Sequence, residues 1–145
     1  MSYYNSKSEA RLRTCDPKLQ FVFRKVVHRY DNTIIEGHRG EAKQNEAFRT
    51  GASEKQWPNG NHNSLPSKAA DSAPYPVEFG GPLVINGKLN QKNLNALLRF
   101  YHYAGFVQGT ASEMGIPIRW GGDWDNDRDL SDQKFNDLVH FELLT

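Results

Sequence analysis

The tract AADSAPYP, residues 69–76, places a carboxylate, Asp71, within a segment that otherwise has the pattern of a buried strand. Alanines flank the aspartate, so its side chain is expected to be removed from water. A buried carboxylate is costly unless a partner pairs with it. A metal ion is one such partner, and other parts of the chain would then have to supply further ligands. The polar loop before the strand, residues 52–68, contains one candidate, His62.

Length and composition indicate one domain and limit the ligands of a metal. A chain of 145 residues, 37% of them hydrophobic, can build one core, so we expect a monomeric single domain over residues 1–145. The 18 basic and 17 acidic residues give a net charge of +1, so neither a nucleic-acid partner nor membrane insertion is expected. The single cysteine, Cys15, excludes an internal disulfide and a cysteine-rich zinc site. Histidines and carboxylates would therefore have to hold any metal.

Hydrophobic periodicity and turn residues predict a mixture of helices and strands. Asp16 and Pro17 have the N-cap and first-turn pattern of a helix that runs to Tyr30. Further helices are expected at 41–51 and 93–115, strands at 32–37, 69–76, within 116–125 and at 138–144, and a strand-turn pattern around Asn86-Gly87. These elements follow no regular βαβ rhythm. We therefore expect an α+β domain, with an antiparallel sheet, helices packed on one side and a metal cleft on the other.

The segment VHFEL near the C-terminus supplies a second histidine. Strand alternation places His140 and Glu142 on the face opposite Phe141, so the two polar side chains face a cleft while the phenylalanine packs on the core. Together, His62, Asp71 and His140 could form a zinc site of two imidazoles and one carboxylate, with an open fourth position for water. This requires a fold that brings the two strands together.

Three segments, in this order, resemble the M15 family of zinc peptidases: GHRGEAKQNEAFRTGAS, HNSLPSKAADSAPYP and IRWGGDWDNDRDLSDQKFNDLVHFEL. The resemblance covers about residues 33–143. It is greatest to the phage L-alanyl-D-glutamate endopeptidases, relatives of the D-Ala-D-Ala peptidases and of the Hedgehog signalling domain. The ordered set Gly-x-Arg…Gln, His…Ala-x-Asp and Asp-x-x-His is specific as a set, although each piece alone is not.

The resemblance implies a role for each matched residue. It makes His62, Asp71 and His140 the zinc ligands, Asp137 the catalytic carboxylate and Arg39 the cation at the reacting carbonyl. In such a site zinc lowers the pKa of its bound water from about 15.7 to about 7. A carboxylate then takes the proton of that water, and a guanidinium stabilises the oxyanion because it stays protonated at any useful pH.

Other interpretations of these residues stay open. Glu142 shares a face with the second histidine and could be the base in place of Asp137. Arg39 could instead pair with a neighbouring glutamate on the surface. Gln44 is expected either to support the turn that carries Arg39 or to contact the substrate.

The acidic stretch DWDNDRDLSDQK, residues 123–134, has carboxylates at alternate positions, which suggests calcium. It is not an EF-hand loop, because Arg128 and Lys134 stand where an EF-hand has glycine and glutamate. We expect this loop to cap and position the strand of Asp137, with a calcium ion at Asp123–Asp129 as the alternative.

The function implied by the resemblance is that of a zinc peptidase acting on the peptidoglycan stem peptide, at the L-Ala–D-Glu bond, as a phage endolysin in host cell lysis. The N-terminal segment MSYYNSKSEARLRTC shows no apolar signal region, so the lysin is expected in the host cytoplasm and on the cell wall after release. One alternative is a D-Ala-D-Ala carboxypeptidase of the same family. Another is a Hedgehog-like module that holds zinc without hydrolysis, although such a module would need neither Asp137 nor Arg39.

Overall fold

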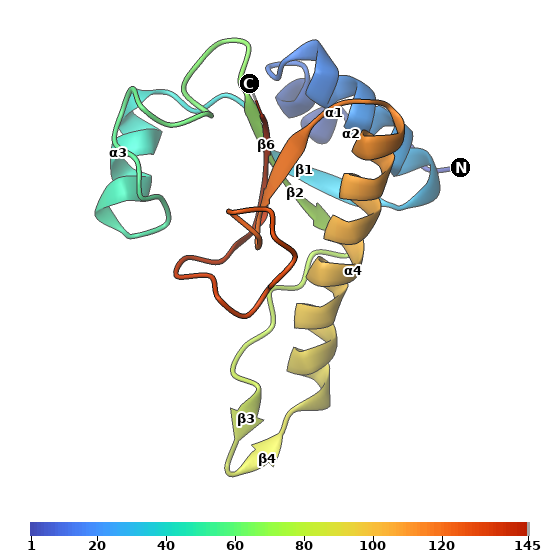
Figure 1. Ribbon diagram of the computed structural model, residues 1–145, viewed down its shortest axis with the longest axis vertical. Coiled ribbons are helices and arrows are strands. Elements are labelled where there is room, and N and C mark those ends of the chain that lie inside the picture. Colours follow the sequence, from blue (N-terminus) through green and yellow to red (C-terminus); the bar gives the residue numbers. More distant parts are fainter. Residues whose placement is uncertain (145) are drawn as a thin grey trace.

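A computed structural model describes residues 1–144 as an antiparallel sheet covered by helices (Figure 1). The elements, in chain order, are α1 (Ser6–Leu12), α2 (Pro17–Arg29), β1 (Asn32–Glu36), α3 (Glu41–Arg49), β2 (Ala69–Pro74), β3 (Val84–Ile85), β4 (Lys88–Leu89), α4 (Gln91–Glu113), β5 (Ile118–Gly121) and β6 (Asp137–Leu143). Helices and strands are thus mixed without a βαβ repeat, and the expected α+β class is confirmed. No helix among the described residues has the length and apolar character needed to cross a membrane.

The sheet has four strands in the order β1-β2-β6-β5, and each neighbouring pair is antiparallel. All six residues of β2 are buried, as expected for an inner strand that carries the AADSAP tract. The register pairs Asp71 of β2 with His140 of β6. The fold therefore brings together the two strands that carry predicted ligands, although these two positions are far apart in the sequence.

The core lies between the sheet and three helices. Helix α1 packs on β1, α4 packs on β2, β5 and β6, and α2 packs on α4. Phe141 of β6 points into this layer, where its ring meets Phe23 of α2 at 5.7 Å and Tyr103 of α4 at 6.1 Å between centroids. The alternation predicted for VHFEL is confirmed, since His140 and Glu142 line a cleft on the other side of the strand.

The expected placement of helices on one side holds for α1, α2 and α4 but is wrong for α3. Figure 1 shows α3 on the opposite side of the sheet, beside the loop of residues 52–68. Its hydrophobic content is low, and Gln44 is its only buried residue, so this short helix has no apolar face with which to cover the sheet. It instead forms one wall of the cleft.

Side-chain caps mark the start of α1, α2 and α4, whereas α3 has none. The Asp16 side chain accepts the Lys18 N–H at the start of α2, as the sequence predicts. The Asn90 side chain does the same for Asn93, which starts α4 at Gln91, slightly before the expected position. Helix α1 was not anticipated, and its N-cap is Asn5.

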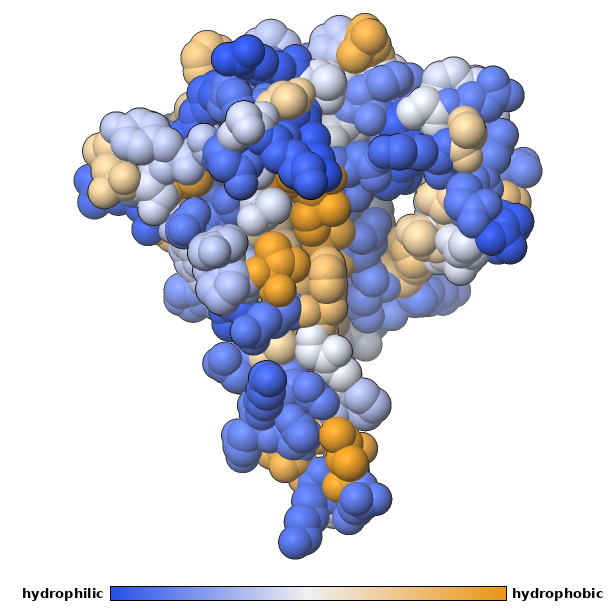
Figure 2. Space-filling view, turned by 180° about the vertical axis from the view of Figure 1, so that it is seen from behind, coloured by the Kyte–Doolittle hydropathy of each residue, from blue (hydrophilic) through white to orange (hydrophobic). Residues whose placement is uncertain are grey.

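A two-stranded hairpin, β3–β4, projects from the body next to the N-terminal half of α4. Its turn residues Asn86 and Gly87 both have positive φ, 52° and 73°, which confirms the predicted turn. Figure 2 shows apolar side chains exposed on this projection, and Val84 and Leu89 are 60% and 50% exposed. The hairpin lies outside the sheet that builds the cleft.

Candidate metal centre and cleft

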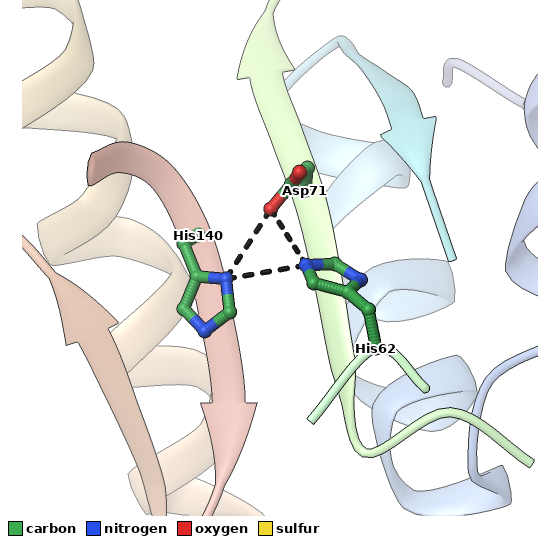
Figure 3. Close-up of side chains that lie close together, drawn as sticks. All are labelled: His62, Asp71 and His140. Atoms are coloured by element: carbon green, nitrogen blue, oxygen red, sulfur yellow. Dashed lines mark hydrogen bonds and ion pairs between the residues drawn. The ribbon is translucent and has the colours of Figure 1, made fainter. Parts of the chain in front are cut away.

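The three predicted ligands converge on one point (Figure 3). Asp71 comes from β2, His62 from the loop before β2, and His140 from β6. All three are buried. The Asp71 Oδ1 atom lies 3.1 Å from His62 Nε2 and 3.4 Å from His140 Nδ1, and the two ring nitrogens lie 3.2 Å apart. The loop-to-strand connection and the β2–β6 register together create this cluster.

Hydrogen bonds to the outer ring nitrogens determine which atoms of the histidines face the cluster. His62 Nδ1 lies 2.7 Å from the Gly37 carbonyl oxygen, and His140 Nε2 lies 2.8 Å from Glu142 Oε1. Both of these oxygens are acceptors, so each outer nitrogen donates an N–H. In the neutral rings His62 Nε2 and His140 Nδ1 therefore carry lone pairs.

When both rings are neutral, two nitrogen lone pairs and one carboxylate oxygen meet with no proton between them. Three acceptors this close repel one another unless a cation lies among them, and oxygen and imidazole donors suit a divalent metal ion. The donor chemistry therefore fits a metal site, as the sequence predicts.

Gly37 can supply its carbonyl to His62 only because it has no side chain. A Cβ atom at this position would overlap the carbonyl oxygen of Arg11 and the hydroxyl of Thr14. The glycine of the Gly-x-Arg motif therefore allows the end of β1 to pass close to the segment after α1 and to reach the histidine.

The second oxygen of Asp71 faces Arg39. The Asp71 Oδ2 atom lies 3.4 Å from Arg39 Nη2, while the same guanidinium bonds Glu36 at 3.0 and 3.2 Å and Gln44 Oε1 at 3.1 Å. Burial raises the pKa of Asp71, but His62 and His140, in their protonated forms, outweigh burial and lower this pKa well below its usual range. Arg39 thus pairs with Glu36, one of the neighbouring glutamates, and also reaches into the cleft.

Gln44 connects Arg39 to the loop of residues 52–68. Its Oε1 accepts from Arg39 and from Asn63, and its Nε2 donates to the Ser53 hydroxyl and to the Lys55 carbonyl. The side chain is buried, with 1% of the residue exposed. These bonds favour the supporting role over direct substrate contact.

Asp137 and Glu142 lie on the same wall but in different settings. Asp137, at the start of β6, is 3.9 Å from His140 Nδ1, and burial together with the Asp71 charge raises its pKa to about 6. Burial would also raise the pKa of Glu142, but hydrogen bonds from His140 and Arg119 outweigh it and lower this pKa to about 2. Asp137 borders the metal cluster directly, whereas Glu142 lies behind His140.

The cluster opens into a cleft of about 460 Å³. One wall comes from α3 and the loop after it, and the other comes from β5, β6 and the acidic loop. Sequence analysis missed three residues of this second wall, Arg119, Trp124 and Phe135. The Trp124 ring lies 5.3 Å from the His140 ring and stacks on Phe135. For Arg119 and Trp124 the signal was the IRWGGDWD tract, which places a polar residue in a strand and an aromatic residue just after it, whereas no local pattern marks Phe135.

A larger hollow, of about 870 Å³, lies between the C-terminal half of α4, β5 and the acidic loop. Its lining includes none of the three predicted zinc ligands, nor Asp137 or Arg39. The candidate site is therefore the smaller of the two hollows, because the predicted metal ligands converge beside it.

The acidic loop is organised by its own carboxylates. Asp123 is buried, and its two oxygens accept the backbone N–H groups of Asp127 at 3.2 Å and Arg128 at 3.0 Å. One carboxylate oxygen from each of Asp123, Asp125 and Asp127 lies within 4.8 Å of the others; Asp125 and Asp127 are exposed, and exposed acidic groups are common without an ion. These bonds order the loop internally, and both its capping of the Asp137 strand and the calcium ion stay predictions.

Comparisons with known proteins agree on one family. A family model described as "Phage L-alanyl-D-glutamate peptidase" matches residues 1–144. The L-alanyl-D-glutamate peptidase of Escherichia phage T5 is 30% identical over 132 residues, which are 90% of this chain and 87% of that protein. The crystal structure of the Serratia marcescens L-Ala D-Glu endopeptidase ChiX matches with a TM-score of 0.66 and 25% identity, over 97% of this chain and 89% of that chain. The matched region includes the whole cleft.

Proposed function

The chain belongs to the phage L-alanyl-D-glutamate peptidase family, and from this premise we propose that it is a zinc peptidase that cleaves the L-Ala–D-Glu bond of peptidoglycan stem peptides. The observation that carries the proposal is the convergence of His62, Asp71 and His140 beside Asp137 in one cleft. Because every proposed site residue comes from one chain, we further propose that residues 1–145 form a single catalytic domain that acts as a monomer. Its biological role would be that of an endolysin that attacks the host cell wall at lysis.

Zinc fits the cluster better than a hard cation does. Two imidazoles and one carboxylate are a common catalytic zinc set, whereas magnesium and calcium favour oxygen ligands. A tetrahedron with zinc–ligand bonds of about 2.0–2.1 Å has edges of about 3.3–3.4 Å. The three donor separations of 3.1, 3.2 and 3.4 Å are close to that length. Bound zinc would lower the pKa of a water molecule and polarise the scissile carbonyl.

Asp137 is the proposed general base. Its carboxylate is 25% exposed in the cleft and 3.9 Å from a proposed ligand, which sets it beside the point where an attacking water would lie. It would take a proton from that water and deliver it to the leaving amine. Glu142 is a weaker candidate, because His140 lies between it and the other two ligands.

Arg39 is proposed to act in two ways. Of the five N–H groups that a guanidinium carries, Arg39 donates four, two to Glu36 and one each to Gln44 and Asp71. The contact with Asp71 orients the carboxylate so that its other oxygen faces the histidines. The remaining N–H, on Nη1, would stabilise the negative charge that develops on the carbonyl oxygen.

The test is digestion of purified peptidoglycan, with the new termini identified by mass spectrometry. The zinc-loaded protein should release a new L-Ala carboxyl terminus and a new D-Glu amino terminus. Asp137→Ala should keep its zinc and lose turnover by a factor of about 10² to 10⁴. Asp137→Asn is the matched variant, since it keeps the shape but accepts no proton, and it should be nearly as slow.

Three outcomes would contradict the proposal. Release of terminal D-Ala would mean that the chain is a carboxypeptidase of the same family. A zinc-loaded protein that releases no termini would mean a binding module. Turnover by Asp137→Ala at the rate of the unmodified protein would remove Asp137 from the mechanism.

A further inference from the structure

Both oxygens of Glu142 are committed to other side chains. Oε1 accepts from His140 Nε2 at 2.8 Å, and Oε2 accepts from Arg119 Nη2, also at 2.8 Å. The Glu142 side chain is only 5% exposed. A carboxylate placed in this way cannot approach a water in the cleft without breaking one of these bonds, so its position is that of a link between Arg119 and His140.

Arg119 is itself held in place on several sides. The β5–β6 register pairs its backbone with that of Glu142. Nη1 donates to the Trp124 carbonyl at 3.4 Å, and the guanidinium lies 5.8 Å from the centre of the Trp124 ring. Its Nε is buried and has no hydrogen-bond partner among residues 1–144. The guanidinium therefore takes the orientation that suits Glu142 and Trp124 rather than one that satisfies all of its own donors.

His140 needs such a link because its environment favours the wrong tautomer. Two carboxylates, Asp71 at 3.4 Å and Asp137 at 3.9 Å, lie near Nδ1. Without Glu142 they would favour the tautomer with a proton on Nδ1, and that proton would occupy the lone pair required for a metal ion. Glu142 is the acceptor that keeps the proton on Nε2 instead.

We propose that Arg119 is a positioning residue of the metal centre, which acts through Glu142 to hold His140 in the tautomer that binds metal. Arg119 binds Oε2 of Glu142 and thereby leaves Oε1 directed at the His140 imidazole. The inference rests on the proposed metal centre and deepens it by assigning two residues outside the ligand set. It also explains why β5, which provides no ligand, borders the cleft.

The chain of contacts makes a specific prediction for Glu142→Gln. Arg119 would bind the amide oxygen, since a guanidinium only donates, and the amide nitrogen would then face His140 Nε2. That nitrogen donates as well, so it would favour the tautomer with the proton on Nδ1. The zinc dissociation constant, measured by competition with a chromophoric chelator, should rise about 10- to 100-fold.

Replacement of Arg119 tests the series of contacts Arg119–Glu142–His140 from its other end. Arg119→Met should raise the zinc dissociation constant by up to about tenfold, and Arg119→Lys should recover part of the affinity because it restores a cation beside Glu142. In the double variant Arg119→Met with Glu142→Gln the amide is free to turn its oxygen toward His140. The double variant should therefore bind zinc no more weakly than Glu142→Gln alone.

Arg24→Met is the matched control, since Arg24 forms an equally short ion pair with Glu9 on the helical side of the molecule. It should leave the zinc dissociation constant unchanged. Unchanged zinc affinity in both Glu142→Gln and Arg119→Lys, each shown to be folded by circular dichroism, would overturn the inference even if Arg119→Met failed to fold. Additive losses in the double variant would also overturn it.

The two proposals fail in different ways. A protein that shows these zinc affinities but cuts no peptidoglycan would contradict the peptidase function and leave the positioning role intact. A protein that cuts peptidoglycan, with zinc affinity insensitive to Glu142 and Arg119, would contradict only the positioning role.

Discussion

Gly121 faces Asp137 across the β5–β6 pair so closely that a Cβ atom at position 121 would overlap the Asp137 carbonyl oxygen and lie 3.0 Å from its Cβ. The register of the two strands shifts between Trp120 and Gly121 at this point. Such irregularities redirect side chains and are frequent beside active sites. Because Gly121 has no side chain, β6 can begin at the mouth of the cleft, with Asp137 as its first residue.

Gly121→Ala is therefore expected to push the start of β6 away from β5. The overlap should cost about 1–3 kcal/mol of folding stability, measured by urea denaturation, and should lower turnover because Asp137 moves. Gly109→Ala is the control. No atom lies within 4 Å of a Cβ there, and alanine in the helix interior should add about 0.5–1 kcal/mol. Full activity and stability in Gly121→Ala would show that the strands separate without cost.

One zinc ion per chain is expected, held by His62, Asp71 and His140. His140→Ala should reduce the zinc content, measured by elemental analysis, well below one per chain. Chelation of the unmodified protein should lower its thermal midpoint, because an ion that binds only the folded state stabilises that state. His102→Ala, which alters an exposed histidine bonded to Tyr30, should keep its zinc. Full occupancy in His140→Ala would mean that the ligand set is wrong.

The acidic loop is expected to tune activity rather than to hold the zinc. Asp125→Asn combined with Asp127→Asn should leave zinc content unchanged, since neither side chain lines the cleft. The Asp127 side chain accepts the Asp129 N–H, and an asparagine side-chain oxygen at that position could accept it as well, so the loop should stay folded. Loss of zinc from this double variant would place a ligand in the loop.

Cys15 is expected to be chemically inert in the folded protein. Burial raises the pKa of its thiol from 9.0 to about 12, partly offset by Thr14. The pKa of the Cys15 thiol is higher in the folded protein than in the unfolded chain. The free energy that the protonated thiol contributes to folding is therefore fully present below pH 9 and is lost as the pH rises toward 12. Ellman's reagent should therefore react only after unfolding.

The raised pKa of the Cys15 thiol is also tested by the stability of the protein measured between about pH 8 and pH 10. The urea midpoint of the unmodified protein should fall with rising pH, and the fall should be shallower in Cys15→Ala. The comparison concerns the slopes, because the cavity left by alanine lowers stability at every pH. Equal slopes would mean that the thiolate forms as readily in the folded state.

Sequence alone determined the features that depend on neighbouring residues. The Asp16 cap, the Asn86-Gly87 turn and the alternation around Phe141 are read within a few residues, and all three are confirmed. Helix α1 was not predicted because a seven-residue helix is too short to show a period. The ligand set was identified from an ordered motif resemblance, because spacing alone does not specify that 62, 71 and 140 meet.

Only the tertiary structure decided the contacts that complete the site. The pairing of Asp71 with His140 and of Arg119 with Glu142 depends on strand registers that join distant segments, and no local pattern specifies them. The same is true of the place of α3, whose polar surface can lie on any wall that offers partners for Gln44. Strand alternation assigns His140 to a face, but which nitrogen turns toward the cleft depends on the Glu142 carboxylate beside the other one. The proposed ligands were therefore readable from the chain, while the groups proposed to orient them became visible only once the sheet had brought β5, β2 and β6 together.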